Sequence, residues 1–300
     1  MEQVTEFILI GFQLPRPLEI FLFAVLLVIF LLTLAGNIMI ITLVCLNQHL
    51  QTPMYFFLCN LSLLKVLFVL SITPKMLVNL VSMKKAISFL GCVAQCYFYF
   101  FLGTTEFILI AVMSFDHYIA ICNPLRYTII MNGWVCTCLV PPGWMGGFLS
   151  TIGPIILLSC LSFCDSNIID HFFCDYTPMI KLSCNDVHFI LLLESVLSSV
   201  VLLSSLCATC ISYLYIIVTI WRMHSTKGRQ RTFSTCASHI TVTSIFYRSA
   251  IFMYSLPSQG HSRDVQKSVA VLTAVVTPLL NPFIYTLRNE KVKEALKDSK

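Results

Sequence analysis

Charged side chains are scarce in this chain. Asp, Glu, Lys and Arg together make up 11% of the 300 residues, whereas hydrophobic residues make up 57%. A soluble globular domain has about 25% charged residues, and so few charges could not cover the surface of a soluble protein of this length. The composition therefore predicts that lipid, rather than water, surrounds most of the chain.

Features that mark several other protein classes are also missing. The net charge of +5 is too small to indicate a nucleic-acid partner, and we find no Gly/Ser-rich linker, low-complexity tract, repeat or cofactor motif. Residues 1–19 lack the basic start of a cleaved signal peptide, so we expect the first apolar run to act as a signal anchor. The sequence predicts one membrane domain over 1–300, without a cofactor or metal.

Seven apolar stretches are long enough to cross a bilayer as helices, which takes about 20 residues each. They lie at about 20–46, 54–80, 92–122, 134–161, 188–223, 232–256 and 265–287. The predicted fold class is an all-α membrane protein, a seven-transmembrane helix bundle.

Loop charge predicts the orientation of the bundle. The side that includes the C-terminus carries ten of the 19 Lys and Arg residues, and the opposite side carries seven together with most of the acids. Basic residues collect on the cytoplasmic side of membrane proteins. We therefore expect the N-terminus outside and the C-terminus inside. The remaining two basic residues, Lys65 and Arg248, fall within predicted spans.

Four cysteines lie on the predicted outer side, where disulfides form. Cys92 opens the third span, and Cys164, Cys174 and Cys184 lie in the long loop between spans four and five. Four cysteines can pair in three ways, and a bridge from Cys92 would hold the loop over the mouth of the bundle. Zinc binding by His171, Cys174 and Cys184 is an alternative, although their spacing matches no common zinc motif.

Seven ordered motifs carry a resemblance to a known family. They are FILIGF at 7–12, TPMYFFLCNLS at 52–62, MSFDHYIAICNPLRY at 113–127, HFFCD at 171–175, SY at 212–213, RTFSTCASH at 231–239 and PLLNPFIYTLRN at 278–289. Each motif alone is weak, but the ordered set resembles the olfactory receptor family of rhodopsin-like G-protein-coupled receptors over nearly the whole chain.

The resemblance implies a multi-pass receptor of the plasma membrane, without enzyme activity. A small volatile odorant would bind among the outer halves of the helices, and the opened inner face would activate a stimulatory G protein and raise cyclic AMP. The resemblance also favours the pairing Cys92–Cys174 with Cys164–Cys184. A short amphipathic helix at 290–297 would lie on the inner leaflet, with its lysines facing anionic lipid.

The family's arrangement also implies a set of pocket residues, each group on one face of its helix. Ordinary helix packing is the alternative explanation for any one of them. The candidate ligand-binding residues are Tyr99, Phe100, Gly103, Thr104, Leu197, Ser198, Val201, Tyr247, Ala250, Ile251 and Tyr254.

A second set implied by the family forms the inner switch that couples to the G protein. Its members are Asp116, His117, Tyr118, Tyr213, His239, Asn281, Pro282 and Tyr285. Relatives usually have Arg where this chain has His117. A neutral imidazole cannot replace a permanently charged guanidinium with five donors. We expect weakened coupling; a tolerated interface residue and a pH-sensitive switch are the alternatives.

Two further charges fall deep within predicted spans. Relatives usually have Asp where this chain has Lys65, and that Asp helps to hold a sodium ion; Glu106 falls in the same interior polar region. We predict that Lys65 and Glu106 form a buried ion pair, with the ammonium in place of the bound ion. The alternative is that Lys65 extends toward an interface.

Arg248 lies in the middle of span six, near the expected floor of the pocket. It could attract an anion in the pocket, pair with Glu106, or direct its side chain toward lipid headgroups. Glu194 lies nearer the outer mouth, where we expect it to be solvated. Changes at these positions could give a receptor that binds odorant but signals poorly.

Two other classes compete with a receptor. A membrane transporter would more often show internal symmetry or paired broken helices, and we find neither in the sequence. An enzyme would need a catalytic constellation, but His239 beside Ser234 and Ser238 has no acid to orient it. Cyclic AMP production compared with vesicle uptake would separate receptor from transporter.

Overall fold

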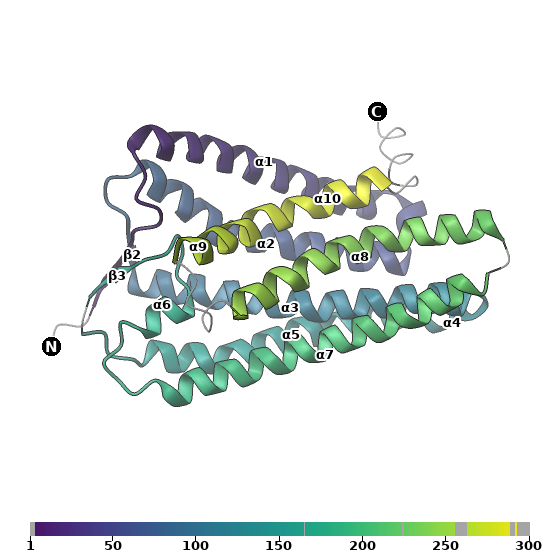
Figure 1. Ribbon diagram of the computed structural model, residues 1–300. Coiled ribbons are helices and arrows are strands. Elements are labelled where there is room, and N and C mark those ends of the chain that lie inside the picture. Colours follow the sequence, from purple (N-terminus) through teal and green to yellow (C-terminus); the bar gives the residue numbers. More distant parts are fainter. Residues whose placement is uncertain (1–3, 165, 224, 256–262, 289–291, 293–300) are drawn as a thin grey trace.

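Seven helical rods lie side by side in the part of the chain that the structure describes (Figure 1). The structure is a computed structural model, and it describes residues 4–164, 166–223, 225–255, 263–288 and 292. Strands and the short helix α6 gather at one end of the bundle, and the short helix α4 lies at the other end. The predicted seven-helix membrane bundle is confirmed.

Six of the rods are single helices and the seventh is interrupted. The single helices are α1 (Arg16–Leu46), α2 (Pro53–Val81), α3 (Phe89–Cys122), α5 (Gly133–Ser159), α7 (His188–Trp221) and α8 (Thr226–Ser255). The seventh rod consists of α9 (Arg263–Val271), a π-helical turn (Leu272–Val276) and α10 (Thr277–Arg288). The connections contain 3-10 turns at Gln48–Leu50 and Pro124–Arg126, helices α4 (Tyr127–Ile130) and α6 (Tyr176–Ile180), and strands β1 (Glu6–Leu9), β2 (Ala86–Ser88) and β3 (Ile168–Ile169).

Local sequence determines where several of these helices begin. Pro53 occupies the first turn of α2, where its missing N–H is harmless because the first N–H groups of a helix have no partner. The Ser88 hydroxyl accepts the Gly91 N–H at 3.2 Å and caps α3. The Asn132 side chain accepts the Val135 N–H at 3.0 Å and caps α5.

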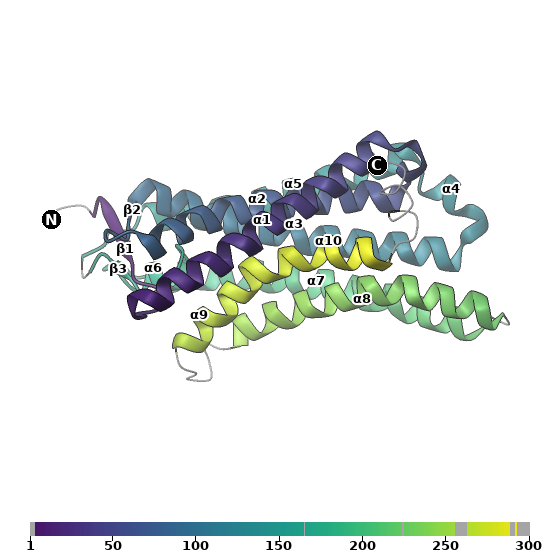
Figure 2. The ribbon, with the colours of Figure 1, turned by 90° about the horizontal axis from the view of Figure 1, so that it is seen from above.

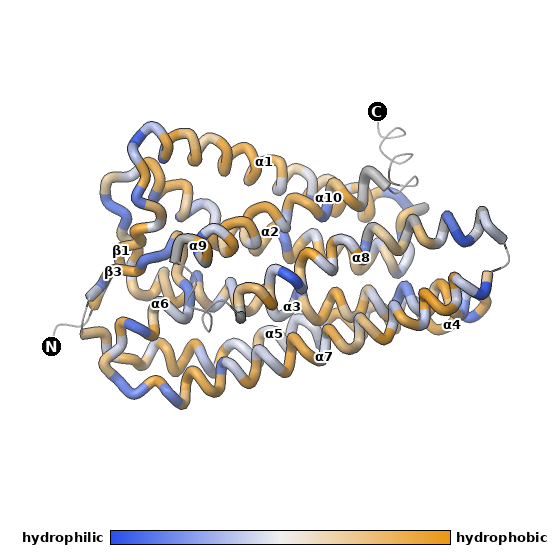
Figure 3. The backbone as a smooth tube through the Cα atoms, viewed as in Figure 1, coloured by the Kyte–Doolittle hydropathy of each residue, from blue (hydrophilic) through white to orange (hydrophobic). Residues whose placement is uncertain are grey.

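Hydropathy along the rods fits a lipid surrounding. Residues in the middle of the bundle are mostly hydrophobic, and hydrophilic residues collect near the ends (Figure 3). Six described helical stretches are long and apolar enough to cross a membrane. The remaining rod, α8, is more polar because it contains His239, Arg248 and several Ser and Thr residues. Large apolar side chains such as Phe21 and Leu203 are exposed, as expected for surfaces that contact acyl chains.

Helix α3 is the central element of the bundle. It contacts α2, α5, α7 and α8, and α10 in turn contacts α1 and α8. The second view shows α10 beside α1 and α8 (Figure 2). Because α3 carries polar residues along its length, this position brings them next to most of the other helices.

A small sheet closes one end of the bundle. Strand β1 pairs antiparallel with β2 and parallel with β3, so that the N-terminal segment joins the first and second loops of this end. Phe7 and Leu9 of β1 are fully buried, and the Phe7 ring packs edge-on against Phe163 with centroids 5.3 Å apart. These strands are too short to be predicted from hydrophobic alternation.

Both predicted disulfides lie at the sheet end. Cys92–Cys174 joins the start of α3 to the long loop, and Cys164–Cys184 closes the loop on itself, with Cα–Cα separations of 5.3 and 5.9 Å. The sheet end is therefore the outer end, because disulfides form on the extracellular side. Two cysteines of the zinc alternative are oxidised in these bridges and cannot act as thiolate ligands.

Ion pairs fasten the outer loops to the helices. The Lys267 ammonium of α9 lies 2.5 Å from the Asp170 carboxylate and donates to the Gly11 carbonyl at 3.2 Å. On the other side, Lys85 pairs with Glu19 of α1 at 2.6 Å. The loops and the N-terminal segment thus form a cover, hereafter the outer cap, that is attached to the first and seventh rods.

The described helices differ from the predicted spans at some boundaries. Helix α8 begins at Thr226, six residues before the predicted start at 232, because a helix need not end where the membrane does. The seventh rod contains a π-helical turn that no sequence pattern indicated. The predicted amphipathic helix at 290–297 falls almost entirely outside the described residues.

The outer cap contains a histidine that should make stability depend on pH. Burial, together with the nearby Lys267 charge, lowers the pKa of His171 from 6.5 to about 4. The unfolded chain therefore binds this proton more readily than the folded chain, so stability falls as the pH falls from about 6.5 to about 4, by up to ~3 kcal/mol. We expect His171→Gln to remove this component.

The measurement is the Tm of the purified receptor and of His171→Gln at about pH 7 and about pH 4.5. Asp175 has the opposite effect, because burial and the Glu194 charge raise its pKa from 3.8 to about 6. Asp175 is present in both proteins, so the difference between them isolates His171. An identical acid-induced loss of Tm in the two proteins would show that His171 is not held neutral.

Candidate functional site

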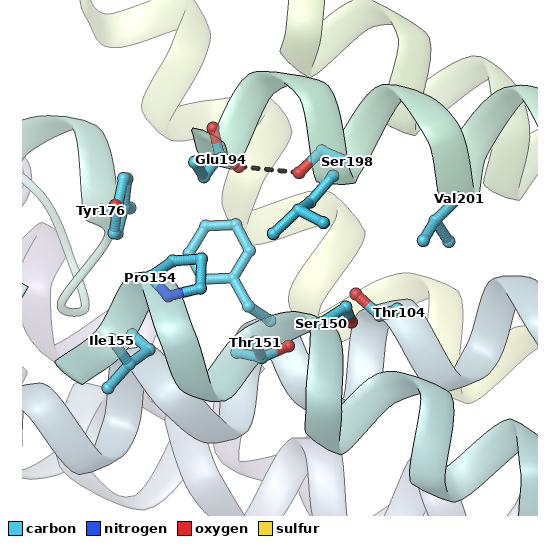
Figure 4. A pocket seen from close by; sticks show the side chains of 11 residues that line it. Thr104, Ser150, Thr151, Pro154, Ile155, Tyr176, Glu194, Ser198 and Val201 are labelled. Carbon is cyan, nitrogen blue, oxygen red and sulfur yellow. Dashed lines mark hydrogen bonds between the residues drawn. The ribbon is translucent and has the colours of Figure 1, made fainter. Parts of the chain in front are cut away.

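A pocket opens between α3, α5, α7 and the outer cap (Figure 4). Its eleven lining residues combine apolar surfaces with hydroxyl groups and one carboxylate. They are Phe100, Thr104, Ser150, Thr151, Pro154, Ile155, Tyr176, Glu194, Leu197, Ser198 and Val201. A mostly apolar cavity with a few convergent polar groups is typical of a site for a small molecule.

The pocket is narrow as it stands. Its volume is about 30 Å³, room for only a few water molecules. A ligand larger than that can bind only if side chains or helices along the walls move apart. Binding of such a ligand therefore requires a rearrangement of the walls that α3, α5 and α7 provide.

Helix α5 approaches α3 closely beneath the pocket because of a glycine. A Cβ at Gly147 would lie 2.1 Å from the Thr105 hydroxyl and 2.9 Å from the Phe101 carbonyl oxygen. Thr105 and Thr151 are buried and turn their hydroxyls to carbonyl oxygens one helical turn back, at 2.8 Å in each case. Both hydroxyls are therefore satisfied within their own helices.

The structure brings together about half of the predicted pocket residues. Those that line the pocket are Phe100, Thr104, Leu197, Ser198 and Val201. The remaining members on α3 lie elsewhere: Tyr99 packs against the Phe68 and Phe173 rings, and a Cβ at Gly103 would have no neighbour within 4 Å.

The predicted residues on α8 do not line this pocket. Tyr247 is buried against Phe107, and its hydroxyl lies 3.3 Å from that of Thr209 on α7. Ile251 is 42% exposed, Ala250 is half-buried, and the side chain of Tyr254 lies outside the described residues. The family resemblance implied these residues as part of the wall, and their helical spacing placed them on one face, but spacing does not reveal which way that face points.

The sequence prediction missed the lining residues on α5 and the outer cap. Ser150 and Thr151 with Pro154 repeat at helical spacing, a signal that could have identified a polar face on an otherwise apolar helix. Tyr176 follows Cys174 by two residues, so its place over the mouth depends on the disulfide to α3. Glu194, expected to be solvated, is half-buried and accepts a hydrogen bond from the Ser198 hydroxyl at 2.8 Å.

A buried ion pair lies between α2 and α3, below the pocket. The Lys65 ammonium donates to the Glu106 carboxylate, and the two side chains are 2% and 3% exposed. The ring centroids of Phe68 and Phe246 lie 5.9 and 5.4 Å from the ammonium, close enough for cation–π attraction. The predicted partners are therefore brought together, and Lys65 does not extend to an interface.

Arg248 lies apart from this pair. Its side chain is exposed rather than directed into the bundle, and it is not among the described residues that line the pocket. A guanidinium inside the bundle would need a counter-charge, and Glu106 already has Lys65. Of the three alternatives for Arg248, the structure supports a side chain that faces outward from the bundle, and not one that enters the pocket or pairs with Glu106.

Helix α10 contains Pro282 in its interior. Proline has no N–H, so the carbonyl of Pro278 one turn earlier loses its helical donor. The Asn37 amide of α1 donates to that carbonyl at 3.3 Å. Gly36 permits the close approach, since a Cβ there would lie 2.9 Å from the Pro282 ring. The buried Asn281 amide has no hydrogen-bond partner among the described residues, so it could bond to water.

Aromatic and imidazole rings connect three helices at the inner end. The His117 ring stacks on His239 of α8 with centroids 4.7 Å apart, and His239 is hydrogen-bonded to the Tyr213 hydroxyl of α7. His117 Nδ1 lies 2.8 Å from the Met113 carbonyl oxygen, which can only accept, so Nδ1 carries the proton.

Asp116 faces a different partner. Its carboxylate accepts a hydrogen bond from the Tyr127 hydroxyl of α4 at 2.9 Å. Tyr118 packs against Tyr215 of α7, with centroids 5.6 Å apart. Three predicted switch residues, His117, His239 and Tyr213, thus meet in one cluster, and Asp116 does not share it. The side chain of Tyr285 lies outside the described residues.

The fold is that of a rhodopsin-like seven-helix bundle. Squid rhodopsin superposes with a TM-score of 0.75 at 17% identity, over 96% of this chain and 82% of that chain. This likeness establishes the fold, and the sequence comparisons establish the family.

The chain belongs to the olfactory receptor family. The family model described as olfactory receptor matches residues 26–299. The human olfactory receptor 6J1 is 54% identical over 295 residues, which cover 98% of this chain and 85% of that protein. The rat olfactory receptor 287 is 49% identical over 97% of this chain and 94% of that protein. The chain is therefore a multi-pass plasma-membrane receptor rather than an enzyme, and its family implies an odorant ligand and a G-protein partner.

The Lys65–Glu106 pair generates a test based on charge removal. Removing one member strands the other in the interior, which costs ~3–5 kcal/mol, whereas replacing both with apolar residues is close to neutral. We expect Lys65→Met and Glu106→Leu each to lower the Tm and surface expression, and the double variant to recover most of both. Glu106→Lys, which places two cations together, should abolish surface expression.

Surface expression is measured by flow cytometry and Tm on purified receptor. Arg248→Met is the matched control, because it removes an exposed cation from the same membrane region and should leave both readouts nearly unchanged. Normal expression of Glu106→Lys, or a double variant whose losses equal the sum of the single losses, would refute the pairing.

Proposed function

We propose that this receptor binds a small volatile odorant in the pocket between α3, α5 and α7, and that it activates a stimulatory G protein and so raises cyclic AMP. The carrying observation is the pocket itself, which lies under the outer cap, has mainly apolar walls and is lined by residues of three helices. Five of the lining residues, on α3 and α7, are ones that the family resemblance implied, and they support the same assignment.

The same two helices connect the pocket to the inner end. Helix α3 carries Phe100 and Thr104 at the pocket, Glu106 at the ion pair and His117 at the inner cluster. Helix α7 carries Glu194 at the pocket and, nineteen residues further along the chain, Tyr213 at the inner cluster. A ligand that separates these helices at the outer end would therefore change the packing of the imidazole rings at the inner end.

We further propose that coupling to the G protein is weakened at His117. A switch residue with a guanidinium can form several charge-assisted hydrogen bonds at once, both within the bundle and to a partner. His117 instead gives its one N–H to the local Met113 carbonyl and stacks on His239. His117 therefore contributes a local hydrogen bond and a ring contact at the inner end, where a guanidinium would offer several charged donors.

A gain-of-function substitution tests this proposal. In cells that express a stimulatory G protein, His117→Arg should raise the maximal odorant-evoked cyclic AMP by ~5-fold or more, the low end of a typical coupling energy between sites. The odorant concentration for half-maximal thermal stabilisation should stay nearly constant, because His117 is far from the pocket. His117→Gln, which is neutral, is the matched control and should not restore coupling.

The same cells distinguish a receptor from a transporter. The proposal requires odorant-evoked cyclic AMP and no odorant-dependent uptake of the compound into vesicles. If His117→Arg responded no better than the parent chain while binding stayed intact, weakened coupling at this residue would be wrong. If cyclic AMP stayed flat but another class of G protein responded, the stimulatory assignment would be wrong.

A further inference from the structure

The outer end of the pocket contains a buried hydroxyl without a partner. Tyr176 lines the pocket and is 2% exposed, and its hydroxyl makes no hydrogen bond to any described residue. Leaving a buried polar group unsatisfied costs about 1–3 kcal/mol. The cost is removed when a ligand supplies a hydrogen-bond partner, so the hydroxyl indicates where a polar group of the ligand lies.

A carboxylate faces the same space. Of the described residues that line the pocket, Glu194 is the only charged one. One of its oxygens accepts from Ser198, and the two side chains lie on the pocket side of α7 (Figure 4). Within the described residues the Glu194 carboxylate forms no ion pair: Ser198 is its hydrogen-bond donor, and the Lys267 ammonium of the outer cap pairs with Asp170. Glu194 therefore has no cation of its own in the described chain.

A second acid strengthens the negative potential at this end. Asp175 precedes Tyr176 and accepts the Tyr176 backbone N–H at 2.8 Å. Burial raises its pKa to about 6, and the charge of Glu194 contributes in the same direction. This second acid favours a cation bound at Glu194 and disfavours an anion there.

We propose that the ligands of this pocket are small aliphatic amines, bound as ammonium ions by Glu194 and the Tyr176 hydroxyl; this inference rests on the proposed function. An ammonium has three donors and no acceptor. One donor meets the Glu194 carboxylate and another meets the Tyr176 oxygen. The apolar chain then lies against Pro154, Leu197 and Val201.

The aromatic walls also suit a cation. Phe100 and Tyr176 pack edge to face with centroids 6.0 Å apart, and both line the pocket. A desolvated ammonium near a ring face gains roughly 1–2 kcal/mol. A neutral alcohol could bond to Tyr176 but would leave Glu194 without a counter-charge, and a carboxylic acid would be repelled by both acids. The pocket should therefore rank amine above alcohol and alcohol above acid.

The experiment compares three probes of equal chain length: hexylamine, 1-hexanol and hexanoic acid. Binding is measured as the probe-induced Tm increase of the purified full-length receptor, which does not require signalling. Cyclic AMP in cells that express the His117→Arg receptor is the second readout. We expect hexylamine to act at concentrations about tenfold or more below those of 1-hexanol, the ratio that a charge-assisted hydrogen bond provides, and hexanoic acid to be inactive.

Two variants locate the effect in the pocket. Glu194→Gln should weaken hexylamine about tenfold and leave 1-hexanol nearly unchanged, and Tyr176→Phe should weaken both probes. Asp186→Asn removes an acid from the outer cap that does not line the pocket, and it is the matched control with no expected change. If Glu194→Gln failed to fold, the order of the three probes on the parent receptor and Tyr176→Phe would still test the proposal.

The outcomes separate this inference from the proposed function. Alcohols or acids that stabilise and activate the receptor better than hexylamine would overturn the amine assignment and leave odorant reception standing. An equal loss for hexylamine in Glu194→Gln and Asp186→Asn would also overturn it. Absence of stabilisation and of cyclic AMP with every odorant class would instead contradict the proposed function itself.

Discussion

Hydrocarbon offers no hydrogen bonds, and this one property of the solvent shapes the interior of the receptor. A side chain that is ionised among the helices must find its counter-charge there. Lys65 and Glu106 meet this requirement across α2 and α3, with the ring of Phe68 on one side and that of Phe246 on another. Arg248 needs no counter-charge inside the bundle, because its side chain is exposed rather than buried. The pair fixes α2 and α3 against each other at one depth, with the pocket between α3, α5 and α7 on its outer side and the imidazole cluster on its inner side.

Along α3 the polar groups have different tasks according to what surrounds them. In the outer half of the helix, Phe100 and Thr104 line a pocket that the disulfide-anchored cap covers. Two residues after Thr104, Glu106 is paired with Lys65, so that this part of the bundle interior is structural. At the inner end, His117 shares a ring stack with His239, which links α3 to α8 without any fixed charge. A receptor built in this way can retain a well-formed binding site while its inner contacts are tuned separately, and binding and coupling need not rise or fall together.

The sequence predicted features that depend on composition or on chemical necessity. Hydropathy located the seven rods, and the requirement for a counter-charge, together with the interior polar region implied by the resemblance, predicted that Lys65 would face Glu106. Features that depend on helix rotation or on loop folding were not predictable. Tyr247 and Ile251 lie one helical turn apart on α8, but only the packed bundle shows that Tyr247 is buried against Phe107 and that Ile251 is exposed, so that neither lines the pocket between α3, α5 and α7. Strand β1 consists of four residues whose pairing depends on two distant loops, and Tyr176 reaches the pocket only because Cys174 is joined to Cys92. The resemblance supplied the disulfide pairing and the inner motifs, which composition alone could not.

The most direct test of the central claim is the ionisation state of the buried carboxyl group. Isotope-edited infrared spectroscopy distinguishes a carboxylate from a protonated carboxylic acid by its stretching band, and comparison with Glu106→Gln assigns the band to Glu106. The account predicts a carboxylate signal in the parent receptor and its replacement by a protonated acid in Lys65→Met, where the counter-charge is gone. A protonated Glu106 in the parent receptor, or a carboxylate that persists unchanged in Lys65→Met, would show that the two side chains do not neutralise each other, and the description of the bundle interior would fail.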